Sequence, residues 1–362
     1  MALVRWRNVT GIFAGALLLA CCSTRSDDSP VVASAPPTSA AAPSTIATTS
    51  TTPPPQPVTI AFAGDINFEG EMGTRLARDP RSAIGPFTDV LSSADIAIGN
   101  LETALGTGGT PENKDFTFQA PASAVDALRA GGFDVVSMAN NHGRDFGPDG
   151  LQESLAIKEA QSDHFIIGIG RTDAEAYAPF TTTVRGQRIA VIAATQVLDG
   201  ELIDSWTATA THPGLASAKR VDALAAAVRE ARGSADTVIV FLHWGIERND
   251  CPSDVQKSLA QQLVDAGADI VIGGHAHRVQ GAGMLGTALV GYGLGNFDFT
   301  AVGPGSEKTG VVRVTVTGRH IDSYEFIPGT VRGAVATPLQ GDAAQQALDY
   351  WIGLRPCTGL AA

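Results

Sequence analysis

Short apolar runs alternate with amphipathic stretches along the chain from residue 58 onward. The runs are rich in Val and Ile, as is typical of parallel strands buried on both faces. Strands that alternate with helices predict a largely parallel sheet covered by helices on both faces, an α/β fold. The predicted strands are 58–63, 94–98, 133–138, 165–169, 189–194, 237–242, 269–272 and 288–290.

Two further patterns sharpen this prediction. A helix is expected between Ser253, a good N-cap residue, and Gly267, which ends it. Its inner face would carry Val255, Leu259 and Leu263. Segment 309–317 alternates apolar and polar residues with a period of two, and 321–327 does so more loosely. These two segments predict antiparallel strands near the end of the chain.

Polar clusters follow six of the predicted strands, at the point where each strand ends. Functional groups gather at the carboxyl ends of the strands in an open parallel sheet, so we expect these clusters to share one edge. The clusters are Gly-Asp-Ile-Asn (64–67), Gly-Asn-Leu-Glu (99–102), Ala-Asn-Asn-His (139–142), His-Trp-Gly (243–245), Gly-Gly-His-Ala-His (273–277) and Gly-Tyr-Gly-Leu-Gly-Asn-Phe (291–297).

Taken together, the clusters indicate a metal site. Each alone has an ordinary explanation, since Asp and Asn are common in turns and helix caps. His275 and His277 are the stronger signal, because two His at i and i+2 in an extended loop point the same way. Carboxylates, an Asn carbonyl and His together suit one or two divalent ions such as Mn, Fe or Zn. Two ions close together would clamp a water for phosphoryl displacement.

The order of these motifs resembles the CapA-type family, which is named for poly-γ-glutamate capsule synthesis. The resemblance spans about residues 58–300 and includes His-Trp-Gly-Ile-Glu (243–247) and Gly-Gly-His-Ala-His (273–277). The family is itself similar to calcineurin-like metallophosphatases. The resemblance therefore implies a four-layer α/β/β/α sandwich with a two-metal site and metal-bound hydroxide chemistry.

The resemblance also implies a role for each residue of the motifs. His142 would act as the catalytic acid together with Asn141, and Glu102 would bridge the metals. Asn67 and Glu102 depart from the phosphatase pattern, which has His and Asp there. The implied metal ligands are Asp65, Glu102, Asn141, His243, His275 and His277. The residues expected to support them are Asn67, Asn100, Asn140, Trp244 and Asn296.

The first 20 residues have the pattern of an export signal. Two Arg precede a short apolar run that contains no acid and ends in small residues. The run is too short to cross a bilayer as a helix. Leu-Leu-Ala-Cys (18–21) resembles a bacterial lipobox, which implies cleavage before Cys21, acylation of its thiol and anchoring to the outer face of the cell membrane. Cleavage before Cys22, an uncleaved anchor and a buried helix are the alternatives.

The remaining chain divides by composition. Residues 21–57 are rich in Pro, Ser, Thr and Ala, and we expect them to form a disordered linker, because such a stretch cannot bury a core. Residues 58–330 form the domain, and 331–362 are a tail packed on it. Export favours a disulfide between Cys251 and Cys357, and two buried thiols are the alternative.

A formal net charge of −12 argues against a nucleic-acid partner, because phosphate backbones are bound by clustered Lys and Arg. Three functions stay open. The first is a membrane-anchored metal-dependent hydrolase or transferase of the CapA type, acting on an envelope polymer or a phosphorylated precursor. The second is a secreted phosphoesterase. The third is a non-catalytic scaffold lipoprotein in a polymer synthesis or export complex.

Overall fold

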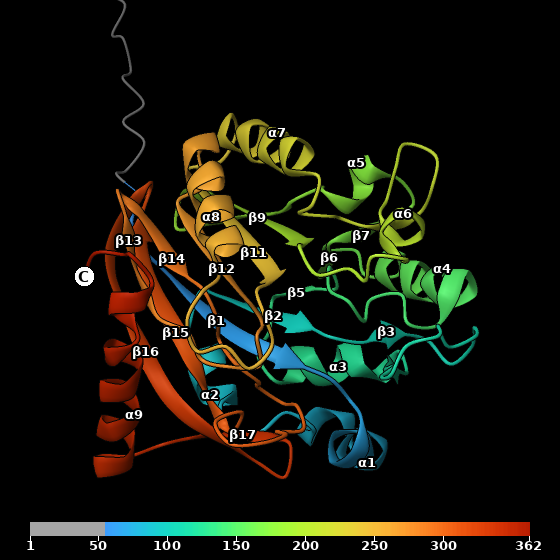
Figure 1. Cartoon of the computed structure of the whole chain (residues 1–362), viewed down its shortest axis with the longest axis horizontal. Coiled ribbons are helices and arrows are strands. Elements are labelled where there is room, and N and C mark those ends of the chain that lie inside the picture. Colours follow the sequence, from blue (N-terminus) through green and yellow to red (C-terminus); the bar gives the residue numbers. More distant parts are fainter. Residues whose placement is uncertain (1–54) are drawn as a thin grey trace, which may run out of the picture. The chain divides into compact units, whose positions relative to one another are not determined.

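The computed structural model of the protein describes residues 55–362 (Figure 1). The expected signal peptide 1–20, the lipidation site at Cys21 and all but the last three residues of the linker 21–57 lie outside this part. No helix within it combines the length and the apolar character needed to cross a bilayer.

The first sheet has seven strands in the order β17-β16-β15-β1-β2-β5-β6. Its parallel half is built from β1 (Val58–Ile66), β2 (Ile96–Leu101), β5 (Val135–Ser137) and β6 (Ile166–Ile167). Its antiparallel half is built from β15 (Lys308–Thr317), β16 (His320–Arg332) and β17 (Val335–Pro338). The antiparallel strands predicted near the end of the chain are therefore confirmed.

The second sheet has six strands in the order β13-β14-β12-β11-β9-β8. The four central strands are parallel: β9 (Gln187–Thr195), β11 (Thr237–Trp244), β12 (Ile270–His275) and β14 (Ala288–Gly291). Antiparallel strands close its two edges, β8 (Phe180–Val184) and β13 (Ala282–Leu285).

Successive residues of the central strands face different cores, which divides the domain into layers. In β1, Ile60 and Phe62 belong to an apolar cluster that includes Phe241 of β11, so they pack between the two sheets. Ala61 and Ala63 belong instead to the cluster that joins the first sheet to its helices. A third cluster joins the second sheet to its own helices. The four-layer α/β/β/α architecture is confirmed.

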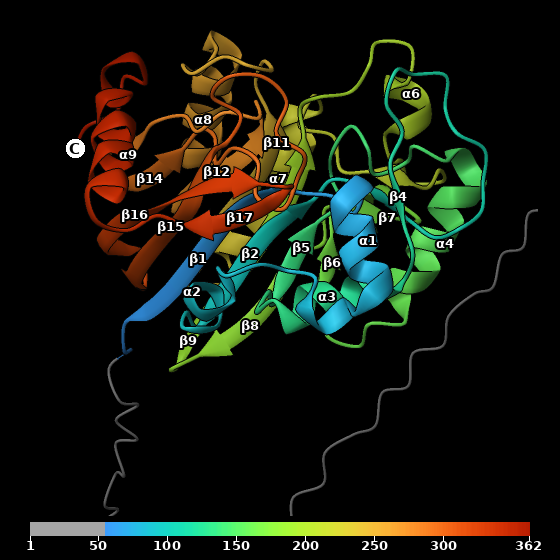
Figure 2. The same ribbon diagram turned by 90° about the horizontal axis from the view of Figure 1, so that it is seen from below.

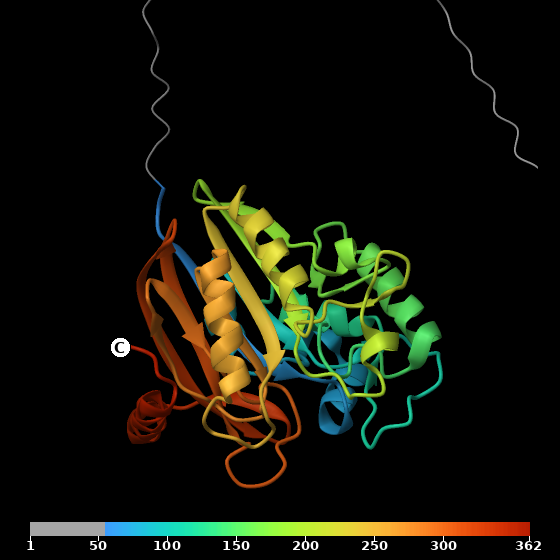
Figure 3. The same cartoon turned by 45° about the horizontal axis from the view of Figure 1, so that its top comes forward.

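Helices cover the outer face of each sheet. Figure 2 shows α1 and α3 beside the first sheet, and Figure 3 shows α7 and α8 together over the second. The helices of the first sheet are α1 (Gly70–Arg78), α2 (Thr88–Ser92), α3 (Ser123–Ala130) and α4 (Gly147–Glu159). Those of the second sheet are α7 (Val221–Arg232) and α8 (Asp254–Ala266). Shorter elements are β3 (Ala104–Leu105), β4 (Gln119–Ala120), β7 (Ile169–Gly170), β10 (Gly214–Leu215), α5 (Asp173–Ala176), α6 (Ile203–Trp206), and the 3-10 turns η1 (Pro80–Ser82) and η2 (Arg355–Cys357).

The end of the chain packs on the domain through α9 (Gly341–Gly353), which runs along β16 (Figure 1). Trp351 of α9 is buried and stacks on Phe326 of β16, with ring centroids 5.0 Å apart. Beyond α9, Cys357 forms a disulfide with Cys251 in the loop after β11. The C-terminal segment is thereby tied to both sheets.

Two expectations from the sequence pattern were wrong. The parallel strands do not form one sheet, because alternation along the chain does not show where the chain passes from one sheet to another. Val255 does not line the inner face of α8, since its side chain is 54% exposed. The ends of α8 were predicted correctly: Ser253 makes a capping box, and Gly267 ends the helix with a left-handed φ of 115°.

Candidate metal centre

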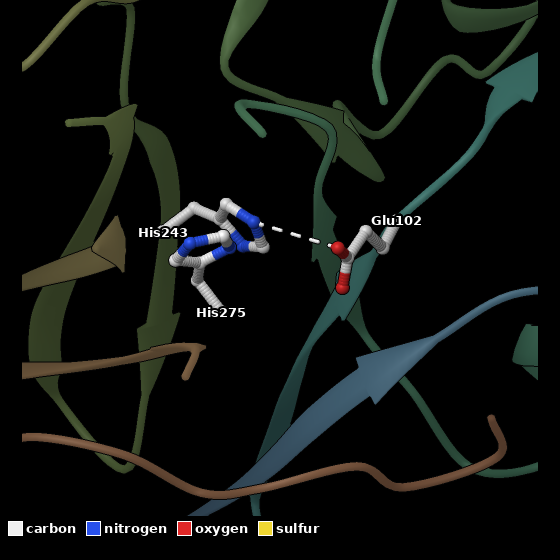
Figure 4. A group of neighbouring side chains, drawn as sticks. All are labelled: Glu102, His243 and His275. Carbon is white, nitrogen blue, oxygen red and sulfur yellow. Dashed lines mark ion pairs between the residues drawn. The ribbon is translucent and has the colours of Figure 1, made fainter. Parts of the chain in front are cut away.

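The ligands expected from the sequence come together where the carboxyl ends of the two sheets meet. Asp65 lies near the end of β1, and Glu102 directly follows β2. His243 and His275 lie at the ends of the neighbouring strands β11 and β12, and His277 follows two residues later. Figure 4 shows Glu102 facing His243 and His275 from the opposite sheet. Packing the sheets face to face therefore joins carboxylates from one sheet to imidazoles from the other.

Glu102 occupies the middle of this group. Its side chain is fully buried, and neither carboxylate oxygen has a hydrogen-bond partner. Three imidazole nitrogens surround Oε1: Nε2 of His243 at 3.6 Å, of His277 at 3.8 Å and of His142 at 3.9 Å. Burial and the nearby Asp65 raise the pKa of Glu102 well above its ordinary value. A buried acid without hydrogen bonds is costly unless a cation compensates it.

Three overlapping sets of residues bring their ligand atoms within 4.8 Å of one another. The first two sets share Glu102, so its carboxylate would contribute to both sites if two ions were bound. The sets are Glu102 with His243 and His275, Asp65 with Glu102 and His277, and Glu247 with His275 and His277. The donor chemistry fits first-row divalent metals, which bind imidazole and carboxylate together.

His243 and His275 are in the form that binds metals. Burial lowers the pKa of His243 well below its ordinary value and that of His275 to about 3, and the neighbouring His277 adds to both shifts. Neutral imidazole is the metal-binding state of histidine. Nδ1 of His275 is buried without a hydrogen-bond partner. The backbone of His275 has a φ of 94°, a strained value for a residue with a side chain.

Asp65 and His277 form the other half of the centre. Oδ1 of Asp65 accepts a hydrogen bond from Nδ2 of Asn100 at 2.9 Å, and Oδ2 accepts one from the backbone N–H of His275 at 3.0 Å. Nδ1 of His277 lies 3.3 Å from Oδ2 of Asp65. Burial acts to lower the pKa of His277, but the charges of Glu102 and Asp65 outweigh it and raise the pKa to about 9. A cation could replace that proton.

Three amide side chains hold the ligands in place. Nδ2 of Asn100 lies 3.1 Å from Nδ1 of His243, and Oδ1 of Asn100 accepts a hydrogen bond from Nδ2 of Asn140 at 3.0 Å. Oδ1 of Asn296 lies 2.8 Å from Nδ1 of His277. Such supporting contacts orient metal ligands and tune their basicity.

Asn141 and His142 lie on the loop after β5, facing the ligands. Oδ1 of Asn141 is 2.7 Å from Nε2 of His243, close enough to bind a metal beside it. Nδ1 of His142 is 2.6 Å from Oδ2 of Asp145, and the opposite nitrogen faces Glu102. Burial lowers the pKa of His142 although Asp145 opposes the shift.

Sequence reasoning missed several residues of the site. Asp145 was detectable, since it follows His142 within one helical turn, but Lys114 gave no signal because it lies in an irregular loop. Nζ of Lys114 lies 2.8 Å from Oδ1 of Asp145. Glu247 belonged to a recognised motif and had no role assigned to it. Phe118 and Phe299 line the site, and their ring centroids are 5.8 Å apart.

Two predicted supporting residues point away from the ligands. Oδ1 of Asn67 accepts a hydrogen bond from the backbone N–H of Glu69 at 3.3 Å, so this side chain stabilises the turn before α1. Nε1 of Trp244 donates to the backbone oxygen of Tyr292 at 2.8 Å, and the two rings stack. Both side chains have local structural roles.

Asp298 is a buried acid outside the ligand group. Its Oδ1 accepts a hydrogen bond from the backbone N–H of Ala336 at 2.9 Å, while Oδ2 has no partner. Burial raises its pKa to about 7, and its backbone hydrogen bonds oppose the shift.

Comparisons with known proteins agree with the resemblance that the order of the motifs indicates. The protein named capsule biosynthesis protein CapA from Bacillus anthracis is 34% identical over 218 residues, which cover 58% of this chain and 51% of that protein. The matched part thus spans about half of that relative's length. PGA biosynthesis protein CapA from Bacillus subtilis (strain 168) is 27% identical over 260 residues, 71% of this chain and 67% of that protein.

A solved structure described as a novel phosphatase from Mycoplasma pneumoniae has a TM-score of 0.47 and 10% identity, over 81% of this chain and 97% of that one. The model of the family described as bacterial capsule synthesis protein PGA_cap matches residues 59–301, most of the described domain. The resemblance to CapA-type proteins is confirmed, and the chain belongs to the bacterial capsule synthesis protein PGA_cap family.

Proposed function

We propose that the chain is a metal-dependent hydrolase or transferase in capsule or envelope polymer biosynthesis. Its substrate would be the polymer, of the poly-γ-glutamate kind, or a phosphorylated precursor. The observation that carries the proposal is the buried carboxylate of Glu102, which has no hydrogen bond and faces three imidazoles. This arrangement is costly without a cation and becomes favourable with one.

The donor set suits one or two divalent ions such as Mn, Fe or Zn. When bound, such ions supply Lewis-acid chemistry, since they acidify water and polarise the bond under attack. The residues that would hold them are Asp65, Glu102, Asn141, His243, His275 and His277.

His142 is the residue placed to move a proton. The contact of its Nδ1 with Asp145 holds the imidazole so that Nε2 faces Glu102 and the centre. At Nε2 it would accept a proton from the attacking nucleophile and, as the catalytic acid, donate it to the leaving group. Lys114 contacts Oδ1 of Asp145 and donates to the backbone oxygen of Asn141, which keeps this loop in place.

Aromatic side chains shield the centre from water. The ring of Phe118 lies 4.2 Å from that of His142, and the ring of Phe299 lies 5.0 Å from that of His277. Excluding water strengthens the electrostatic interactions within a site. The two rings therefore favour polar chemistry at the ligands they cover.

Metal analysis of the full chain, purified without chelator, tests the proposal. We expect one or two Mn, Fe or Zn ions per chain, lost in Asp65→Ala and His275→Ala. Asp222→Ala, which removes an exposed acid in α7, is the matched control and should keep the metal. Circular dichroism checks that each variant is folded. A wild-type chain that binds no metal even after soaking would refute the proposal and favour the scaffold.

Substrate profiling separates this proposal from a secreted phosphoesterase. We expect the metal-loaded chain to leave simple aryl phosphates intact and to act on envelope polymer or its phosphorylated precursors. Rapid cleavage of p-nitrophenyl phosphate that is lost in His142→Ala would favour the phosphoesterase instead.

The N-terminal Leu-Leu-Ala-Cys (18–21) supports a location for this activity. We propose that a lipid on Cys21 anchors the chain to the outer face of the membrane, next to a polymer synthesis or export complex. Cys21→Ser should move the protein from the membrane fraction to the medium or leave its precursor uncleaved. Unchanged processing and fractionation would refute the anchor.

A further inference from the structure

We propose that Glu247 is an additional metal ligand, which completes the set formed by Asp65, Glu102 and His277 from the solvent side. This inference rests on the proposed function, because it requires a metal at this centre. Glu247 is the last residue of the motif His-Trp-Gly-Ile-Glu, and its carboxylate is exposed.

The two ligand sets that share Glu102 are unequal. Glu102, His243 and His275 gain a fourth donor from Asn141, whose Oδ1 lies 2.7 Å from Nε2 of His243. The set of Asp65, Glu102 and His277 has three donors. Protein-bound divalent metals of this kind usually take about four to six ligands. The second set therefore has one protein ligand fewer than the first.

Glu247 lies beside one residue of each set, His277 of the second and His275 of the first, and the second set is the one that lacks a fourth donor. One carboxylate oxygen is within 4.8 Å of a ring nitrogen of His275 and of a ring nitrogen of His277. Glu247 is thus an acid on the solvent side of two imidazoles.

The loop that carries Glu247 is held in place at several points. The backbone N–H of Arg248 donates to the backbone oxygen of Ala276 at 2.8 Å, within the segment between His275 and His277. Nε2 of Gln280 donates to the backbone oxygen of Asn249 at 2.8 Å. The disulfide of Cys251 ties the end of the loop to the C-terminal segment. Little backbone entropy would be lost when Glu247 binds a metal.

Glu247 also has no competing partner in the described part of the chain, where it makes neither a hydrogen bond nor an ion pair. Most surface acids can turn freely into solvent, and exposure alone carries no implication. Here the carboxylate is unpaired and its loop is held in place by hydrogen bonds and a disulfide. One of the two imidazoles beside it, that of His275, has an Nδ1 without a hydrogen-bond partner.

Calorimetric titration of the full chain with Mn²⁺ or Zn²⁺ tests this inference. We expect Glu247→Gln to lower the affinity for one ion by about 10–100-fold, the range for perturbed metal sites. The affinity for the other ion should stay nearly unchanged. Asp250→Asn is the matched control, since it removes the same charge from the same exposed loop. A purely long-range charge effect would lower the affinity for both ions, and it would do so equally in Glu247→Gln and Asp250→Asn.

The double variant Cys251→Ser/Cys357→Ser provides a second measurement, because it removes the disulfide that holds the loop of Glu247. We expect it to lower the affinity for the same ion as Glu247→Gln does. If Glu247→Gln binds every ion as tightly as the wild type, the inference is overturned while the proposed function stands. If both Glu247→Gln and Asp250→Asn weaken binding equally, the inference is also overturned. A wild-type chain that binds neither metal refutes the proposed function and this inference with it.

Discussion

Gly274 offers a direct test of the centre, because it lies against the carboxylate of Asp65. A Cβ at position 274 would lie 2.2 Å from Oδ1 and 3.0 Å from Cγ of Asp65. Gly274 has no left-handed φ, so Ala can adopt its backbone conformation. The expected effect of Gly274→Ala is therefore purely steric, and it falls on Asp65, one of the proposed metal ligands.

The size of the effect follows from these distances. Oδ1 must move by about 1 Å to reach an ordinary van der Waals separation. That movement breaks its 2.9 Å hydrogen bond from Asn100, which costs about 1.5–3 kcal/mol because the acceptor is charged. Misplacing a reacting or binding group by about 1 Å costs about 100-fold. We expect Gly274→Ala to lower the metal affinity by about 10–100-fold. We also expect it to lower the free energy of unfolding.

Metal titration and urea unfolding of the same preparations measure both effects. Gly200→Ala is the control, because its Cβ would meet no atom within 4 Å. Gly273→Ala gives a contrast, since its Cβ would lie 1.8 Å from the backbone oxygen of Leu242 in the paired strand β11. That clash cannot be relieved by a side-chain rotation, so we expect this variant not to fold.

Wild-type metal affinity in a folded Gly274→Ala chain would refute the reasoning. It would mean that the carboxylate of Asp65 can leave its position without consequence, and that it is not a ligand. A loss of folding as complete as that of Gly273→Ala would also contradict the expected order of severity.

Two further predictions concern stability. Asp298 keeps its proton up to about pH 7 in the folded state but loses it near pH 4 when unfolded, so the free energy of unfolding should fall by up to about 4 kcal/mol between these values. Asp298→Asn should flatten this decline in urea unfolding measured from pH 4 to 8, and an unchanged slope would contradict the assignment. Trp351→Ala should cost about 3–5 kcal/mol, because it removes a buried ring stacked on Phe326. A loss below about 1 kcal/mol would show that α9 contributes little to stability.

The placement of the candidate ligands was predictable, because polar functional groups gather at the carboxyl ends of parallel strands. Asp65, Glu102 and His243 each fall at a strand end, and the strands themselves were visible as short apolar runs. Local rules also located the ends of α8, since a capping box at Ser253 and a left-handed Gly267 depend only on neighbouring residues.

Other features could not be seen in the chain. Lys114 reaches the site from an irregular loop, and no periodicity marks such a position. Asn67 lies two residues after Asp65 and was expected to support the ligands, yet its side chain turns back to Glu69. The direction of a side chain beyond the end of a strand depends on the path of the loop, which local sequence does not specify.

The sequence by itself determined which side chains would lie at strand ends, because burial on both faces forces apolar runs and leaves polar residues where the runs stop. Only the tertiary structure decided that these ends belong to two sheets, with Asp65 and Glu102 on one and His243 and His275 on the other. It also placed the carboxylate of Glu102 among imidazoles without a hydrogen bond. The physical reason is that packing two sheets face to face joins residues far apart in the chain, and that packing depends on the complementarity of whole surfaces rather than on local pattern.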